Sequence, residues 1–174
     1  KITVLIMTLL FTVGLISGCG TNTAKNSASE TPKKIVVGLD DNYPPMGFKD
    51  ENNEITGFDI DVAKEAAKRL GSEVEFKAID WDSKEAELKS GRVDVLWNGL
   101  DITEKRKENM MFSEPYMDNR QIVFVQKGNP AAIKSVDDLK GKVSGTQSGG
   151  TAEEYIDGNA EFKNSLKGVK KYSD

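Results

Sequence analysis

The sequence predicts an α/β fold with a largely parallel sheet, because strand-like and helix-like segments alternate from Lys33 onward. Three short runs have the β-branched or alternating pattern of strands, at residues 34–39, 74–79 and 93–97. Two segments between them, residues 57–71 and 83–91, have apolar residues at helical spacing. The predicted order is therefore β-α-β-α-β.

The first predicted helix, residues 57–71, is amphipathic. One face carries its apolar side chains, Ile60, Ala63, Ala67 and Leu70, and lysines and a glutamate occupy the other. Asp59 is expected to cap the start of this helix and Gly71 to end it. Asp59, Asp61 and Asp94 are all interpreted as capping or solvated residues.

The second half of the chain repeats the alternation. A strand is predicted at residues 121–126, a short helix at 136–139, a strand around 143–147, and a helix beginning near Thr151. After Tyr155 the sequence has few apolar residues, so we expect no second complete core there. The glycine-rich turn before Thr151 offers N–H groups to an anion, but no lysine follows it as in a phosphate-binding P-loop.

Polar residues follow each of the first three predicted strands, at 40–43, 80–82 and 98–101. The carboxyl ends of parallel strands meet at one edge of a sheet, so these turns are expected to converge on one cleft. Arg106 follows the third turn, and a guanidinium beside backbone donors suits a carboxylate ligand. The alternative is an ordinary surface arginine.

Composition excludes several classes of function. The chain has 174 residues, of which 30% are charged and 37% hydrophobic, and a formal net charge of -4, as in soluble globular proteins. Lysines alternate with glutamates, so no nucleic-acid partner is predicted. Histidine is absent, which excludes histidine-based triads and histidine metal ligands in this stretch of chain. No metal site and no cofactor are predicted.

The N-terminal segment has the features of a lipoprotein signal peptide, predicted at residues 1–18. Its apolar run is short for a membrane span, and residues 16–19 resemble a bacterial lipobox, which implies lipidation of Cys19. A transmembrane anchor with an incidental cysteine is the alternative. Residues 19–33 are rich in Gly, Ser, Thr and Asn and are interpreted as a flexible tether, so the folded part is expected outside the membrane.

The motifs, taken in order, resemble the family 3 extracellular solute-binding proteins of amino-acid ABC importers. The matching stretches are VGLDDNYPPMGF, GFDIDVAKEAAKRLG, AIDWDS, SGRVDVLWNGLDITEKRKENMMFSEPY and DLKGKVSGTQSGGTAEEY. The resemblance spans residues 34 to about 155. It implies a periplasmic-binding-protein-like fold with lobe I at residues 34–119 and a partial lobe II at 120–174. It also implies that the chain is C-terminally incomplete and binds weakly as it stands.

The same resemblance assigns roles to the cleft residues. Arg106 is expected to grip the ligand's α-carboxylate, with N–H groups from Gly149 to Thr151 sharing it. Asn98 and Gly99, together with residue 101, are expected to hold the α-ammonium group. Asp101 departs from the family's serine or threonine: its carboxylate would strengthen the ammonium contact but would repel the ligand's carboxylate and compete for Arg106.

Three further residues have open alternatives. Tyr43 and Trp81 match positions whose rings sandwich the ligand, although aromatic residues also pack in cores. Asp40 matches a position that contacts the ligand side chain in binders of basic amino acids, and it could equally cap a turn.

The resemblance implies a lipid-anchored protein on the outer face of the bacterial cytoplasmic membrane that captures a free amino acid. Its expected partners are the ABC permease and its ATPase, and it is not expected to be an enzyme. The ligand is expected to be polar or cationic, with cystine, glutamine, arginine and lysine all open. The alternative is an enzyme on the same fold, either dehydratase-like or a module of a cell-wall lytic enzyme, with Asp80, Asp82 and Asp101 converging. A sensor-kinase input domain is a third reading.

Overall fold

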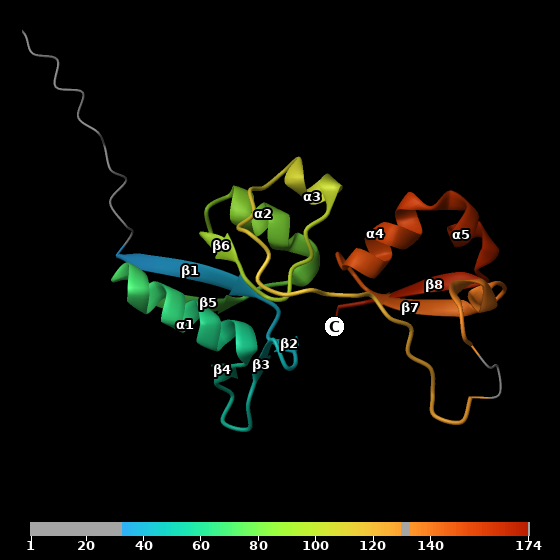
Figure 1. The fold of residues 1–174 in the computed structure, drawn as a ribbon, viewed down its shortest axis with the longest axis horizontal. Coiled ribbons are helices and arrows are strands. Elements are labelled where there is room, and N and C mark those ends of the chain that lie inside the picture. The colour runs from blue at the N-terminus through green and yellow to red at the C-terminus, as the bar shows by residue number, and fades with distance from the viewer. Residues whose placement is uncertain (1–32, 130–132, 174) are drawn as a thin grey trace, which may run out of the picture. The chain divides into compact units, whose positions relative to one another are not determined.

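The first sheet is built in the predicted order of strand, helix, strand, helix and strand, with a small additional sheet between its first strand and first helix (Figure 1). The computed structural model describes residues 33–129 and 133–173, and these belong to one compact unit. The predicted signal peptide, Cys19 and residues 19–32 of the predicted tether lie outside the described residues. The division into two lobes at residue 119 stays a prediction.

Three parallel strands form the sheet of the N-terminal region, which we define as residues 33–107. They are β1 (Lys34–Leu39), β5 (Glu73–Ala78) and β6 (Val95–Leu96), in the order β5-β1-β6. The register pairs Lys34 with Glu73 and Val37 with Val95. The third strand is shorter than the predicted 93–97. Because β1 lies in the centre, its side chains Val37 and Leu39 are fully buried.

Helices flank this sheet on both sides of β1 in Figure 1. The first is α1 (Phe58–Leu70); the second, α2 (Lys84–Lys89), follows the 3₁₀ turn η1 (Trp81–Ser83). The buried face of α1 contains the predicted Ile60, Ala63 and Ala67, whereas Leu70 is exposed. Gly71 ends α1 in the left-handed conformation, as predicted. The predicted cap is wrong: Gly57 occupies the N-cap position, and the Asp59 side chain points into the protein.

A small antiparallel sheet follows β1, where the sequence indicated only turns. It consists of β2 (Asn42–Tyr43), β3 (Gly47–Lys49) and β4 (Ile55–Thr56), in the order β2-β3-β4. Gly57 connects β4 to α1 with φ 131°, and a Cβ there would lie 2.5 Å from the Met46 carbonyl oxygen. Only glycine fits this close approach.

The predicted strand at residues 121–126 does not form. After α3 (Glu104–Lys107), residues 108–129 contain neither helix nor strand. A strand requires a hydrogen-bonded neighbour, and no other segment among the described residues pairs with this one. Its apolar side chains are exposed instead, with Phe124 at 85% and Ile122 at 66%. The β-propensity of the segment was therefore a misleading signal.

The C-terminal region, residues 133–173, is a two-stranded parallel sheet with short helices. Its elements are η2 (Val136–Leu139), β7 (Val143–Gln147), α4 (Thr151–Gly158), α5 (Ala160–Ser165) and β8 (Gly168–Tyr172). The predictions of η2, β7 and the start of α4 are confirmed. Beyond Tyr155, α5 and β8 also form, because backbone pairing of Val143 with Gly168 and onward orders this stretch despite its few apolar residues.

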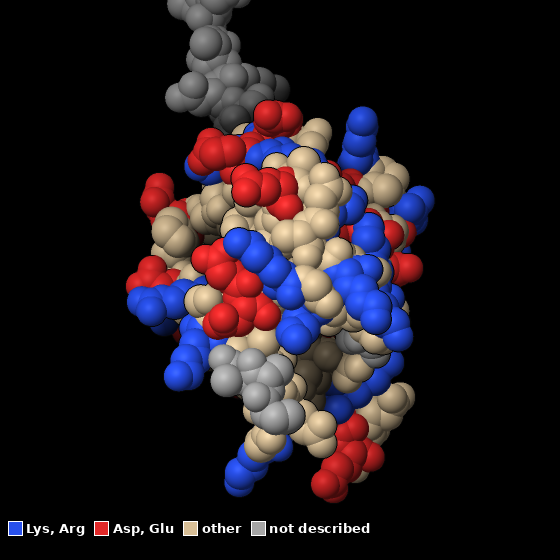
Figure 2. All heavy atoms as spheres, turned by 90° about the vertical axis from the view of Figure 1, so that its right-hand side faces the viewer, with Lys and Arg blue, Asp and Glu red and all other residues tan. Residues whose placement is uncertain are grey.

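The surface in the view of Figure 2 carries acidic and basic side chains interspersed, without one sign covering it. Among the helices in the described part of the chain, none combines the length and apolar character needed to cross a membrane.

Candidate functional site

The structure buries Arg106, leaving 3% of it exposed, although it lies in a helix of only four residues. The side chain of Thr103 caps this helix by accepting a hydrogen bond from the Arg106 N–H at 3.3 Å. The cap fixes the residue from which the guanidinium extends. The alternative of an ordinary surface arginine is therefore wrong.

The guanidinium of Arg106 meets groups from both regions of the chain. Nη1 donates to the Asp101 carbonyl at 2.9 Å and to Thr151 Oγ1 at 3.2 Å, and Nη2 donates to the Gly149 carbonyl at 3.2 Å. Nε lies 3.5 Å from Glu154 Oε2. The structure thus brings together four predicted site residues, Arg106, Asp101, Gly149 and Thr151.

Two glutamates that were not predicted, Glu153 and Glu154, also contact this cluster. Glu154 accepts from Thr103 Oγ1 at 2.8 Å in addition to its pair with Arg106. Glu153 accepts from the Gly149 N–H at 2.6 Å, so this predicted carboxylate donor is already used. Both glutamates lie in the first turn of α4, where acidic residues are commonly stabilised by the helix dipole. Because acidic residues are common in this position, the sequence did not indicate that these two glutamates make specific contacts.

Asp101 is held differently from its predicted role. Its carboxylate accepts from Asn119 Nδ2 at 2.6 Å and from Gln121 Nε2 at 3.0 Å, and it is the backbone carbonyl that binds Arg106. The expectation that the carboxylate competes for Arg106 is therefore wrong in this structure. Uncharged amide donors from residues 119–121 satisfy the Asp101 carboxylate instead.

Lys84 lies beside this cluster and was not predicted. It is buried, with 3% exposed, and its Nζ donates to the Gly149 carbonyl at 2.7 Å and to the Trp81 carbonyl at 3.1 Å. The ammonium also lies 5.3 Å from the centre of the Trp81 ring, a cation–π distance. Burial lowers the pKa of Lys84, and the charge of Arg106 lowers it further.

The two predicted aromatic residues, Tyr43 and Trp81, are close to different glycines of the site. A Cβ on Gly99 would be 3.1 Å from a ring carbon of Tyr43, whereas Trp81 neighbours Gly149 through its carbonyl. Tyr43 is 39% exposed and Trp81 is buried. Burial raises the pKa of the Tyr43 hydroxyl, with the nearby Asp101 and Asp40 adding to it. Their role as a ligand sandwich stays a prediction.

Asp40 and Asn98 are both buried at the ends of neighbouring strands. The Asp40 N–H donates to Asn98 Oδ1 at 3.2 Å, and Asp40 in turn accepts from the Asn42 N–H at 2.9 Å, the turn contact that was one of its two readings. Its second oxygen accepts from Gln147 Nε2 at 2.5 Å. The Asn98 Nδ2 amide has no hydrogen-bond partner among the described residues.

Asp59 positions the turn that contains Gly99. One carboxylate oxygen accepts from the Gly99 N–H at 2.6 Å and the other from the Tyr116 hydroxyl at 2.7 Å. Burial raises the pKa of Asp59, while these two hydrogen bonds counteract the shift. Burial raises the pKa of Tyr116 as well. Asp59 is thus an internal anchor, a role that its position at the start of a helix did not reveal.

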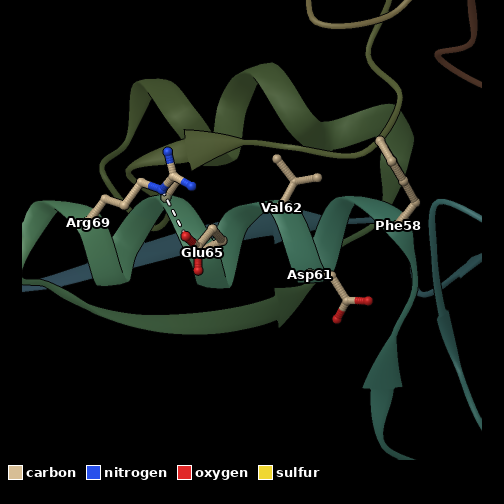
Figure 3. A pocket seen from close by; sticks show the side chains of 6 residues that line it. Phe58, Asp61, Val62, Glu65 and Arg69 are labelled. Atoms are coloured by element: carbon tan, nitrogen blue, oxygen red, sulfur yellow. Dashed lines mark hydrogen bonds and ion pairs between the residues drawn. The ribbon is translucent and has the colours of Figure 1, made fainter.

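The described residues contain no group of three or more His, Cys, Asp or Glu side chains suited to a metal ion. Asp80, one member of the suggested acidic convergence, accepts from the Asp82 N–H at 3.0 Å and so caps η1. A pocket of about 520 Å³ lies along α1, lined by Phe58, Asp61, Val62, Glu65, Ala66 and Arg69 (Figure 3). It contains none of the predicted site residues.

Comparison with known proteins places this geometry in context. The chain matches the model of bacterial extracellular solute-binding proteins, family 3, over residues 35–172. The L-cystine-binding protein TcyJ of Escherichia coli (strain K12) is 39% identical over 127 residues, which are 73% of this chain and 48% of that protein. This chain spans about half the length of the curated relatives it matches.

Solved structures of amino-acid-binding proteins have a similar fold. An ancestral arginine-binding protein bound to arginine is 44% identical with a TM-score of 0.76, covering 83% of this chain and 62% of the other. An ancestral amino acid-binding protein, described as a precursor of cyclohexadienyl dehydratase, is 39% identical with a TM-score of 0.74, covering 82% and 62%. The alternating α/β elements, the buried Arg106 and the family match lead to one conclusion: this chain belongs to the bacterial extracellular solute-binding proteins of family 3.

Proposed function

We propose that this chain is the amino-acid-binding part of a solute-binding protein that serves an ABC importer. The observation that carries the proposal is the burial of Arg106 between Asp101 on one side and Gly149 and Thr151 on the other. A guanidinium so placed can exchange its carbonyl and hydroxyl partners for the carboxylate of an amino acid. Relatives named for binding cystine and arginine support this class of ligand.

In this proposal the remaining site residues orient the amino acid. Arg106 and Thr151 bind the α-carboxylate, and a charge-assisted hydrogen bond of this kind contributes about 1.5 to 3 kcal/mol. The carbonyl groups near Asn98 and Gly99, with Asp101, face the α-ammonium. Tyr43 and Trp81 contact the ligand's side chain, and Asp40 selects a polar or cationic one. Glycine at position 149 allows the backbone there to approach the backbone of Asp82 closely, since a Cβ would lie 2.8 Å from Asp82 Cα.

We further propose that lipidation of Cys19 anchors the protein to the outer face of the cytoplasmic membrane. The loaded protein would then deliver its amino acid to a permease driven by an ATPase. In this proposal, residues of the N-terminal region and of the C-terminal region bind the same ligand. The arrangement of the two regions would therefore depend on the ligand. The enzyme alternative is supported by the name of one neighbour, a precursor of cyclohexadienyl dehydratase, which is itself described as an amino acid-binding protein.

The test is calorimetric titration of the chain with L-arginine and L-cystine, followed by the remaining proteinogenic amino acids. Arg106→Ala is expected to lose binding of whichever amino acid the wild type takes, because no other guanidinium in the described residues occupies this position. Arg69→Ala is the matched control, since that guanidinium is exposed and pairs with Glu65 in its own helix. Undiminished affinity in Arg106→Ala would refute the assigned role.

A further inference from the structure

The position of Lys84 in the structure differs from that of an ordinary helix lysine. Lysines of amphipathic helices extend into solvent, as Lys89 at the end of the same helix does. Lys84 begins α2 and is instead as deeply buried as Arg106. Its side chain returns over the Trp81 ring and ends at the carbonyl of Gly149, 65 residues further along the chain.

Among the residues that the structure describes, none is a direct counterion of Lys84. Within the part of the chain that the structure describes, no carboxylate oxygen lies within 4.0 Å of its Nζ, and its two acceptors are neutral carbonyls. A buried lysine is ordinarily paired with an opposite charge, because removing an ammonium group from water is costly. The arrangement therefore leaves positive charge to be compensated by something else.

Lys84 and Arg106 converge on one atom. The Gly149 carbonyl oxygen accepts from Lys84 Nζ at 2.7 Å and from Arg106 Nη2 at 3.2 Å. Two like charges beside one neutral acceptor repel each other, whereas a carboxylate offers two oxygens and a full negative charge. An anionic oxygen at this point would satisfy both cations.

We propose that Lys84 is a second cationic ligand-binding residue, which together with Arg106 clamps the carboxylate group of the bound amino acid. The inference rests on the proposed function and extends it, since it assigns to the carboxylate end of the site a residue that the family resemblance did not. It defines the ligand class as amino acids with a free carboxylate and predicts weak binding of their carboxamides.

The electrostatic surroundings determine how the clamp responds to pH. Arg106 from α3 opposes protonation of Lys84, while Glu85 from α2, Asp82 from η1 and Glu154 from α4 favour it. A bound carboxylate favours the ammonium form, so the ligand raises the pKa of Lys84. Affinity should consequently fall as the pH rises through that pKa, and Lys84→Met should lack this part of the alkaline loss, keeping only the part that comes from deprotonation of the ligand's own α-ammonium.

The experiment compares wild type, Lys84→Met and Lys89→Met by calorimetry with L-arginine and L-cystine at neutral pH and at two alkaline values. Methionine replaces the apolar stem of Lys84 without its terminal ammonium group. Loss of one charge-assisted contact predicts binding about 10- to 100-fold weaker in Lys84→Met, and Lys89→Met should match the wild type. Argininamide should bind the wild type far more weakly than arginine.

The outcomes separate the two proposals. Wild type that binds neither these probes nor any other amino acid contradicts the proposed function and the clamp together. Equal affinities in wild type and Lys84→Met contradict the clamp alone. Should Lys84→Met fail to fold, competitive acetylation of the wild type with peptide mass spectrometry decides. Ligand-induced protection of the Lys84 amine, with a raised pKa, supports the clamp, and an unchanged labelling profile overturns it.

Discussion

The N-terminal and C-terminal regions share an alternation of strands and helices but are stabilised in different ways. In the N-terminal region, seven apolar side chains are buried around one sheet: Val37, Leu39, Ile60, Ala63, Ala67, Trp81 and Val93. Among the described residues of the C-terminal region, only Ile156 and Leu166 reach that burial. Its order depends on the pairing of β7 with β8 and on partly exposed ion pairs such as Lys171 with Glu153. The comparison teaches that the same element pattern does not imply the same resistance to unfolding.

The largest expected effect comes from emptying the better-packed core. Leu39→Ala removes a side chain with no exposed surface from the central strand and should lower the free energy of unfolding by about 2 to 5 kcal/mol. Ile156→Ala is the matched substitution in the other region, and it should cost less because few buried neighbours surround the cavity. Urea denaturation followed by circular dichroism measures both. Equal losses would break the contrast between the regions.

A smaller effect is expected at the hydroxyl that binds Asp59. Tyr116→Phe keeps the ring beside Phe58 and Trp97 but leaves one buried carboxylate oxygen without its donor, which should cost about 1 to 3 kcal/mol. Tyr155→Phe is the control in the C-terminal region, since the structure gives its hydroxyl no hydrogen bond within the described residues and its ring still packs on Phe162. If the melting temperature of Tyr116→Phe equals that of the wild type, the hydrogen bond between Tyr116 and Asp59 does not stabilise the fold.

The smallest effect is an opposite response of the two regions to acid. Burial raises the pKa of Asp59 above 3.8, so its charged form opposes folding at neutral pH and protonation relieves this cost as the pH falls through the raised value. In the C-terminal region, hydrogen bonds lower the pKa values of Glu153, Asp138 and Asp157 from 4.5, 3.8 and 3.8. Their stabilisation is complete above those ordinary values and is lost as the pH falls through the lowered ones.

Amide hydrogen exchange at stepped pH values between 6 and 3, a range spanning these ordinary carboxyl values, can follow this difference. Amides of β7 and β8 should lose protection before those of β1. In Asp59→Asn, the stabilisation that the N-terminal region gains when Asp59 is protonated at low pH should be absent. Earlier loss of protection in β1 would contradict the assignment of the shifts.

The sequence predicted the elements whose patterns are local. Helix α1 and strands β1, β5 and β7 follow from periodicity and from glycine signals that act within a few residues. The failures have a common cause: the 121–126 run lacked a partner strand, whereas β8 found one. Pairing between distant segments is a tertiary property, and β-propensity alone does not report it.

The same distinction applies to the site. Arg106 was identified through the resemblance, because its local pattern left an ordinary surface arginine open. The resemblance also placed residues 149–151 at the same ligand carboxylate, but it did not predict the direct contact between Arg106 and Thr151. Lys84 was missed because a lysine in a charged helix indicates a solvated face, and Asp59 was missed because an aspartate at a helix start indicates a cap. In both cases burial by distant segments changed the meaning of an ordinary residue.

The uncharged stretch at residues 121–126 has a practical consequence for anyone handling this chain. Six residues with high β-propensity, without proline or glycine and with Phe124 almost fully in solvent, are a template on which further copies can add as stacked strands. Concentrated solutions should therefore seed fibrils from this stretch, and fibril formation should slow on dilution because it requires contact between copies.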